Sequence, residues 1–254
     1  MITGIDVSHH QLPATLKWPT IATSQPFAFA RATYGTSPDR FFDDHYTGAR
    51  AAGLRVGGYH FFRPRAPVVA QIDAFCKQLD LVKHTDDSLP PALDVEGNEK
   101  YDGDFTAERY AEPVRRCIDA LITRYGSVFL YVTQRDWARL GNPDCINLPG
   151  VMLWVAHYTT KPKPATPLKL PWTLWQYTGK GRVDGAGDQD IDMNRFAGTV
   201  DDLPTIGRPV LKEASGSPSS EPPPIDRDAV LGVVGDTLAQ QSRDYFSDDD
   251  WGEA

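Results

Sequence analysis

Short apolar runs rich in β-branched and aromatic residues recur along the first two hundred residues and predict strands. Eight such runs lie at residues 3–8, 27–33, 54–62, 90–96, 127–133, 151–158, 172–178 and 189–193. Apolar residues spaced three or four apart predict helices at 41–53, 68–82 and 110–125. Gly53 and Gly126 are expected to end two of these helices. Pro113 lies inside the third pattern and predicts a late start or a kink there.

The order of these elements indicates the fold class. Strands that alternate with helices favour a parallel sheet, and eight strands favour closure into a barrel. The last three strands are separated only by loops, such as the proline-rich segment 159–171. We therefore expect an α/β protein with an irregular, TIM-like β/α barrel of eight strands, in which helices belong mainly to the first part.

The barrel pattern stops near residue 200 and sets the expected domain boundaries. Residues 1–206 form the barrel domain, and 207–226 read as a Pro/Ser-rich linker. Residues 227–254 carry seven acids and two arginines, which is typical of a flexible acidic tail. An alternative is a short helix around the apolar patch 229–234 that docks on a partner or on the barrel.

Charge and cysteine content exclude several classes of protein. The net charge of −8 and the lack of Lys/Arg blocks argue against nucleic acid as a partner. Three distant cysteines, Cys76, Cys117 and Cys145, cannot form a complete disulfide framework and are expected to be reduced core thiols. The first residues do not resemble a signal peptide, and no apolar run reaches the ~18 residues of a membrane span. We therefore expect synthesis in the cytoplasm without a signal peptide, and no membrane insertion.

Four carboxylates follow strand ends and form the candidate site. Asp94 and Glu96 point to the same face of the fourth strand, roughly 6.6 Å apart along the backbone. Asp6 ends the first strand and Asp192 ends the eighth, and these strands are neighbours in a closed barrel. All four acids are expected to meet at the end of the barrel where the strands finish. Any one of them alone could equally be a cap or a surface charge.

Crowded carboxylates suit a particular chemistry. Like charges held together raise a pKa, and a raised pKa is what a general acid needs near neutral pH. One acid can then protonate a leaving oxygen while another stabilises the oxocarbenium-like centre, as in glycoside hydrolysis.

Six motifs in order resemble one known family. They are GIDVSHHQ (4–11), YHFFRP (59–64), LDVEG (93–97), WVAHY (154–158), WQYT (175–178) and IDMNRF (191–196). Together they are similar to the Chalaropsis-type lysozymes, glycoside hydrolase family 25, over about residues 1–200. The resemblance implies a retaining muramidase that cuts the β-1,4 bond between N-acetylmuramic acid and N-acetylglucosamine in peptidoglycan.

The resemblance also implies roles for the acids. Glu96 matches the proton donor that later acts as base. Asp94 matches the second acid, either a nucleophile or the group that steadies an acetamido-derived oxazolinium intermediate. Asp6 and Asp192 match supporting acids. The sequence departs from the family at RATYGT (31–36), where the family usually has Lys-Ala-Thr-Glu-Gly: Arg31 keeps the positive charge and Tyr34 loses the acid.

Aromatic residues near strand ends are candidates for holding the sugar. They are Tyr59, Trp154, Tyr158, Trp175 and Tyr177, and for each ring core packing is an equal alternative. Gln176 could hydrogen-bond an N-acetyl or hydroxyl group of the sugar. The expected partner is therefore the peptidoglycan glycan strand, bound by a monomer that needs no cofactor.

Other functions remain open from the residues alone. A chitinase-like hydrolase and a non-catalytic wall-binding barrel both fit the fold. His9 and His10 invite a metal-dependent deacetylase, but adjacent strand residues face opposite ways, so no metal site is expected there. Absence of a signal peptide fits a phage endolysin released through a membrane hole, and nearly as well a toxin exported by a dedicated machine.

Overall fold

A computed structural model describes residues 1–97 and 99–206 of the chain. The predicted linker at 207–226 and the predicted tail at 227–254 lie outside the described residues.

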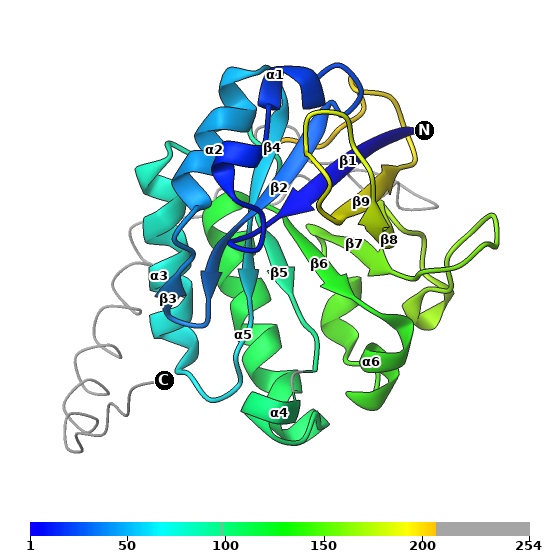
Figure 1. The fold of residues 1–254 in the computed structure, drawn as a ribbon. Helices are drawn as coiled ribbons and strands as arrows, with labels where there is room; N and C mark the ends of the chain where they lie inside the picture. Colours follow the sequence, from blue (N-terminus) through cyan, green and yellow to red (C-terminus); the bar gives the residue numbers. More distant parts are fainter. Residues whose placement is uncertain (98, 207–254) are drawn as a thin grey trace, which may run out of the picture. The chain divides into compact units, whose positions relative to one another are not determined.

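Eight strands close into a barrel, as expected from the apolar runs (Figure 1). The strands of the described chain are β1 (Ile2–Val7), β2 (Phe27–Tyr34), β3 (Ser37–Pro38), β4 (Arg55–Phe61), β5 (Ala92–Asp94), β6 (Val128–Val132), β7 (Val151–Ala156), β8 (Leu174–Gly181) and β9 (Ile191–Phe196). Around the barrel their order is β1-β9-β8-β7-β6-β5-β4-β2, and pairing of β2 with β1 closes it. The two-residue β3 pairs only with the end of β2 and stands outside the ring.

The last strand runs against the other seven strands of the barrel. Pairings from β1 through β2 and β4 to β8 are parallel, whereas β9 is antiparallel to both β8 and β1. This corrects the expectation that Asp192 ends the eighth strand of the barrel. Asp192 is the second residue of β9, and because this strand is reversed, its start lies where the parallel strands finish. We call this end of the barrel the mouth.

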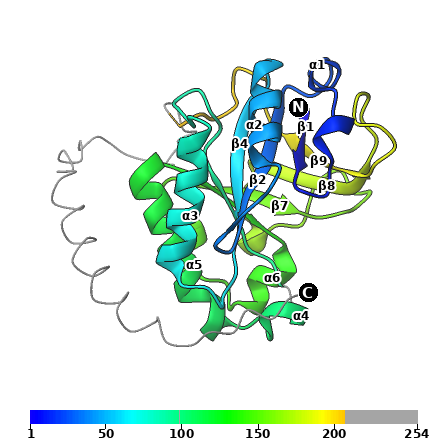
Figure 2. The same cartoon turned by 60° about the vertical axis from the view of Figure 1, so that its left-hand side comes forward.

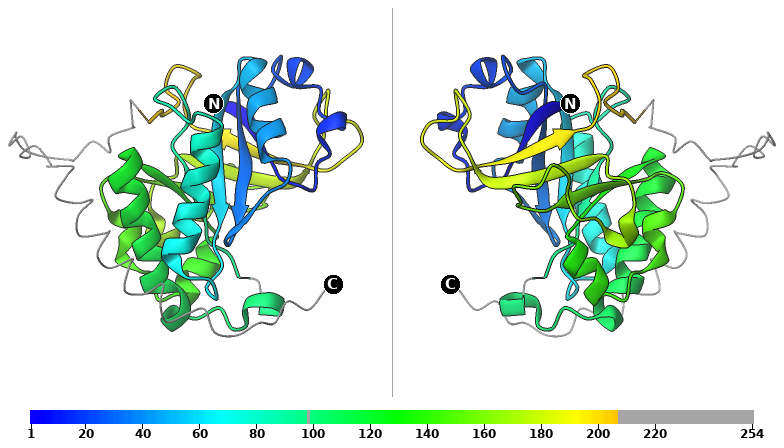
Figure 3. Two further views of the ribbon diagram at one scale, coloured as in Figure 1. Left: turned by 90° about the vertical axis from the view of Figure 1, so that its left-hand side faces the viewer. Right: turned by 90° about the vertical axis from the view of Figure 1, so that its right-hand side faces the viewer.

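Helices cover one part of the barrel and leave another bare. The described helices are α1 (Trp18–Ile21), α2 (Phe42–Ala51), α3 (Val68–Leu81), α4 (Glu99–Asp102), α5 (Ala107–Tyr125) and α6 (Gln134–Arg139), with 3-10 turns at Pro13–Thr15, Asp144–Asn147 and Pro167–Lys169. Helices α2, α3 and α5 pack against β2, β4 and β6, and α3 lies beside α5 (Figure 2). Among the helices of residues 1–97 and 99–206, none covers the side that carries β8 and β9 (Figure 3). The expected irregular barrel, with helices mainly in its first part, is confirmed.

Helix α5 shows how packing overrides a local signal. The helix is continuous from Ala107 to Tyr125, so the late start expected at Pro113 is wrong. Tyr110, in the turn before the proline, is fully buried and its ring lies 4.3 Å from the ring of Phe105. This contact holds the first turn in place although Pro113 cannot donate a backbone hydrogen bond. Gly126 ends the helix as expected, with φ of +76° and its amide on the Ile122 carbonyl.

Alternation along each strand divides the apolar residues into two cores. An outer core lies between the sheet and the helices and includes the three cysteines, which are free and buried. An inner core fills the barrel away from the mouth and is formed by Phe27, Phe29, Leu89, Ala92, Phe129, Met152, Trp154, Leu174, Phe196 and Leu203. Gly57 makes room for this inner core, because a Cβ at that position would overlap the ring of Phe29. The apolar inner core leaves the mouth end for polar residues.

No helix among the described residues combines the length and apolar character that crossing a membrane requires.

Candidate active site

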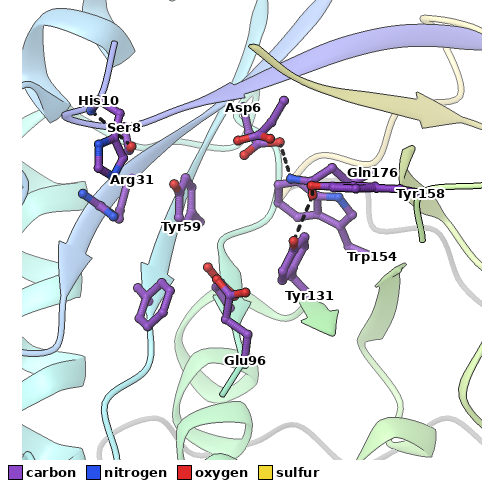
Figure 4. A pocket seen from close by; sticks show the side chains of 13 residues that line it. Asp6, Ser8, His10, Arg31, Tyr59, Glu96, Tyr131, Trp154, Tyr158 and Gln176 are labelled. Atoms are coloured by element: carbon purple, nitrogen blue, oxygen red, sulfur yellow. Dashed lines mark hydrogen bonds between the residues drawn. The ribbon is translucent and has the colours of Figure 1, made fainter. Parts of the chain in front are cut away.

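The four acids expected at the mouth line a single cavity of about 280 Å³ (Figure 4). They come from three strands and the loop that follows one of them: Asp6 from β1, Asp94 from the end of β5, Glu96 just beyond it, and Asp192 from β9. All occupy the inward parity of their strands, because Ile5, Leu93 and Val95 pack in the outer core. Strand alternation therefore turns acids that are distant in sequence toward one space.

Asp94 is the most deeply buried acid without hydrogen-bond compensation. Its side chain belongs to a residue only 7% exposed, and its Oδ1 has no hydrogen-bond partner among the described residues. Burial raises the pKa of Asp94 well above its ordinary value, and the charges of Glu96 and Asp6 raise it further. A buried, unpartnered carboxyl oxygen in a cavity wall is available to a bound molecule.

Glu96 is partly open to the cavity and is the best candidate for a proton donor. Burial raises the pKa of Glu96 to about 7, with further increases from the charges of Asp136 and Asp6. Asp136 lies in the first turn of α6, where its backbone amide donates to the Thr133 hydroxyl at 2.9 Å. At neutral pH a carboxyl with this pKa is protonated in about half of the molecules.

Asp6 is held by two buried amides. Its Oδ2 accepts hydrogen bonds from Asn194 Nδ2 at 2.7 Å and from Gln176 Nε2 at 3.0 Å. Burial raises the pKa of Asp6 to about 6, and these two hydrogen bonds oppose that increase. Gln176 also accepts hydrogen bonds on Oε1 from the hydroxyls of Tyr131, at 2.9 Å, and Tyr158, at 2.8 Å. One buried amide thus joins β1, β6, β8 and the loop after β7.

Asp192 lies opposite Asp6 across the β1–β9 pair. Burial raises the pKa of Asp192 to about 8, and the charges of Asp6 and Glu96 contribute to the increase. Gly179 on β8 provides the space for this side chain. A Cβ at that position would lie 2.9 Å from Asp192 Oδ1 and 3.1 Å from the Tyr158 hydroxyl oxygen.

Arg31 brings positive charge to the acidic cavity. Its Nε donates to Oδ2 of the buried Asp39 at 2.9 Å, and its Nη2 contacts His9 Nδ1. The guanidinium lowers the pKa of both Asp94 and Glu96, against the larger effect of burial. Arg31 is therefore a fixed counter-charge that favours ionisation of the acids beside it.

The two adjacent histidines do not face opposite ways, which corrects the sequence argument. They follow β1 in a turn rather than continuing the strand, and their ring centroids lie 4.0 Å apart. Within residues 1–97 and 99–206, no group of three or more His, Cys, Asp or Glu side chains is arranged to hold a metal ion. His10 lines the acidic cavity, and His9 contacts Arg31.

The candidate sugar-binding residues separate into two groups. Tyr59, Trp154, Tyr158 and Gln176 line the acidic cavity. Trp154 is only 2% exposed and donates from Nε1 to Asn194 Oδ1 at 2.8 Å, so it forms the floor, whereas Tyr158 is 59% exposed at the rim.

Trp175 and Tyr177 do not line this cavity. Both belong to the opposite parity of β8 from Gln176 and lie with the outer core, where the Arg195 guanidinium stacks on them. Because side chains alternate along a strand, Trp175 and Gln176 cannot share a face. The expectation that these two rings lie at the mouth with Gln176 is therefore wrong.

Several residues of the cavity were not singled out from the sequence. Tyr131 is the register partner of Asp94 on β6, and Asn194 holds Asp6. Ser8 and Phe61 complete the lining. A signal was present for each, since all four have the inward parity of their strands, or of a strand's continuation, near the mouth.

The chain is similar to known proteins over most of its length. Residues 5–186 match the model of glycosyl hydrolases family 25. Lysozyme M1 of Streptomyces globisporus is 33% identical over 208 residues, which cover 78% of this chain and 69% of that protein.

Solved structures of similar proteins also resemble this chain. The bacterial lysozyme from Streptomyces coelicolor superposes with a TM-score of 0.69 at 30% identity, covering 80% of this chain and 94% of that one. A family 25 glycosyl hydrolase from Bacillus anthracis gives a TM-score of 0.66 at 29% identity, covering 78% and 90%. The chain belongs to the glycosyl hydrolases of family 25.

Proposed function

We propose that this protein is a peptidoglycan muramidase, a lysozyme that hydrolyses the β-1,4 bond between N-acetylmuramic acid and N-acetylglucosamine with retention of configuration. The observation that carries the proposal is the set of four carboxylates in one cavity wall, with the Glu96 pKa at about 7. Membership of a glycosyl hydrolase family and similarity to proteins named lysozymes support it.

Glu96 acts as the general acid and then as the base. Its proton goes to the bridging oxygen as the bond from that oxygen to the muramic acid C1 breaks, and the glucosamine leaves with a free hydroxyl. Glu96 then removes a proton from the water that attacks C1. A positioned general acid accelerates such a step about 10²–10⁴-fold, which corresponds to roughly 3–5 kcal/mol of barrier.

Asp94 acts at C1 on the side away from the leaving group. Two mechanisms give retention: attack by Asp94 itself, or attack by the sugar's acetamido oxygen while Asp94 steadies the oxazolinium ion that forms. The uncompensated Oδ1 of Asp94 supplies the contact that either mechanism needs. An acetamido-mimicking thiazoline inhibitor that binds tightly selects the second mechanism, and a trapped glycosyl ester on Asp94 selects the first.

The remaining polar residues position these two acids. Asp6 and Asp192 hold protons and charge close to the reacting pair, and Gln176 fixes Asp6. Tyr59, Trp154 and Tyr158 offer aromatic surfaces to the apolar faces of the sugar rings. Their placement in the cavity wall suits holding a distorted ring for the transition state.

The proposed substrate is the peptidoglycan glycan strand, cut by a monomer without a cofactor. The proposed site of action is the bacterial cell wall, reached after release from the cytoplasm.

Purified cell walls test the proposal through two linked measurements. Wild-type protein is expected to clear a wall suspension and to release fragments with muramic acid at the reducing end by mass spectrometry. Glu96→Gln, which keeps the shape of the side chain but cannot supply the proton, should clear walls about 10²–10⁴-fold more slowly. Reducing-end glucosamine, or equal clearing by Glu96→Gln, contradicts the proposal. Turnover of chitin oligomers in place of walls indicates the chitinase-like alternative.

A further inference from the structure

A second hollow opens beside the acidic cavity. It has a volume of about 660 Å³ and shares His10, Arg31 and Phe61 with the cavity wall. We call it the arginine groove, because Arg31, Arg40 and Arg63 line it. A polymer bound in the cavity would therefore have a branch of the same molecule within reach of the groove.

The charge of the arginine groove is opposite to that of the protein. Three arginines and one carboxylate, Asp39, line it, in a chain whose net charge is −8. Arg31 is bonded to Asp39, whereas Arg40 is exposed and forms no ion pair with any residue in the part of the chain that the structure describes. The lining thus keeps an excess of positive charge next to a cavity lined by four acids.

Arg63 is already held in place before a ligand binds, so binding costs this side chain little conformational entropy. Arg63 Nε donates to Oδ1 of the fully buried Asp102 at 2.6 Å, and its guanidinium lies 4.3 Å from the centre of the Tyr34 ring. The Tyr34 ring in turn lies 4.7 Å from the ring of Phe61. Among the described residues, no acceptor takes the terminal Nη1 or Nη2 hydrogens of Arg63. A guanidinium fixed through Nε can present both of these nitrogens to a carboxylate.

The geometry points to the peptide stem of peptidoglycan as the ligand of the arginine groove, an inference that rests on the proposed function. In peptidoglycan the peptide branches from the lactyl group of muramic acid, beside the bond that the cavity would cut. In intact peptidoglycan the lactyl carboxyl group is amidated by the stem, so the charges that an arginine can bind lie on the stem, which carries carboxylates and small apolar side chains. Arginines match the carboxylates, and the rings of Tyr34 and of the exposed Tyr101 match the apolar groups.

The groove also offsets a repulsion between the acidic cavity and an anionic branch of the substrate. Those acids at the mouth that are ionised repel an anionic branch of the substrate, and burial increases the strength of that repulsion. Arg40 and Arg63 attract the branch away from the acids while the sugar stays in the cavity. The stem therefore adds binding energy next to the scissile bond rather than opposing it.

Glycan strands with and without stems provide the test. Strands purified from wall are divided, and one half is stripped of peptide by an amidase, so each stripped muramic acid keeps a lactyl carboxylate but has lost the carboxylates and apolar groups of the stem. Wild-type protein is expected to cleave the intact strands with a kcat/KM about five- to tenfold higher, as one or two exposed charge-assisted contacts would give. Arg40→Gln should lose most of this preference and cleave the stripped strands like wild type. Arg40→Lys should keep part of it, and added salt should weaken the wild-type preference.

Arg116→Gln is the matched control. Arg116 is exposed on α5, has no ion-pair partner among the residues described, and lines neither hollow, so the same charge change there should leave the preference intact. A third substrate, intact strands freed of covalently attached phosphate polymer, separates the possible anions. Loss of the preference on this substrate overturns the peptide assignment in favour of the phosphate polymer.

Two further outcomes overturn the inference without touching the proposed function. One is equal cleavage of intact and stripped strands by wild type. The other is an equal loss on both substrates in Arg40→Gln, which would assign the groove to the glycan. Failure of wild type to cleave any strand instead contradicts the muramidase activity itself.

Discussion

Asp6 and Asp192 are register partners across the antiparallel β1–β9 pair, so two carboxyl groups stand directly opposite each other at the mouth of the barrel. Partners in such a pair have Cβ atoms about 4.5–5.5 Å apart, and like charges there are destabilising. Both residues have a raised pKa, about 6 for Asp6 and about 8 for Asp192, with burial as the largest cause. The pair therefore keeps about one proton at neutral pH, and ionisation of both carboxyl groups destabilises the folded protein.

Removing one partner of this pair should make the protein less sensitive to alkaline pH. The folded pKa of Asp192 lies above its unfolded value, so its stabilising contribution is complete below about pH 4 and is lost as pH rises toward 8. Asp192→Asn should raise the free energy of unfolding at pH 8 by on the order of 1–3 kcal/mol relative to its effect at pH 4. Urea unfolding at both pH values measures this difference. Glu112→Gln, an exposed acid on α5, should show none.

The charge of Asp136 should set the alkaline limit of activity. Glu96 must be protonated to act as the acid, so kcat/KM should fall as pH rises through about 7. Asp136 raises the pKa of Glu96, and Asp136→Asn should therefore move the alkaline limb to lower pH. The asparagine Oδ1 can still accept from the Thr133 hydroxyl, which preserves the start of α6. An unmoved limb in a folded variant shows that Asp136 does not tune the donor.

Gln176 should act through Asp6 rather than on the sugar. Its side chain has one hydrogen bond to Asp6 and two from tyrosines, and a leucine would leave those groups unpaired at a cost of about 1–3 kcal/mol of stability. Gln176→Leu should also lower kcat by about tenfold or more, equivalent to ~1.4 kcal/mol of barrier. The acid limb of the pH profile should move to higher pH, because the hydrogen bond from Gln176 lowers the pKa of Asp6 and its loss raises that pKa.

The neighbour of Gln176 supplies the control for that experiment. Trp175→Phe removes a partly buried hydrogen bond to the His157 carbonyl on the other face of β8. It should reduce stability while kcat and the pH profile stay as in wild type. A shifted acid limb in Trp175→Phe means that the kinetic effect of Gln176→Leu reflects general loosening of the strand.

Substitutions of two tyrosines on opposite sides of the barrel wall should have different effects, one on substrate binding and the other on stability. Tyr158→Ala removes an exposed ring at the cavity rim and should raise KM for glycan strands about three- to tenfold. Tyr177→Ala should leave KM unchanged and reduce stability by about 0.5–1 kcal/mol, because the Arg195 guanidinium lies 4.1 Å from its ring centre. Steady-state kinetics and thermal unfolding of both variants measure these effects. A raised KM in Tyr177→Ala contradicts the placement of Tyr177 on the outer face of the barrel.

Strand positions were predictable because they depend on local pattern. The run at 90–96 is apolar apart from Asp94 and Glu96 near its end, and β5 lies where that run predicts. The period of two also predicts that Asp94 and Glu96 share a face, and both line the acidic cavity. The same rule applied to WQYT would have excluded Trp175 from any site that contains Gln176.

Strand direction and hydrogen-bond networks depend on contacts that sequence pattern does not contain. The run at 189–193 looks the same whether β9 is parallel or reversed, and only its pairing with β1 and β8 decides. The alternation along the strand predicts that Asn194 points inward, but only that pairing places it against Asp6. The turn that brings His9 and His10 together arises from hydrogen bonds such as the one from the His9 amide to Asp39, thirty residues away.

The reversal of β9 also decides at which end of the barrel the described residues finish. After passing Asp192 at the mouth, the strand runs to Phe196 beside Ile2, and Leu203 then plugs the inner core at the far rim. The described chain ends at Ile206, whose amide bonds to the Ser88 carbonyl on that rim. A tag or reporter that replaces the residues after Ile206 would be joined at the rim opposite the mouth, away from the end of the barrel that a long, stiff wall polymer must approach.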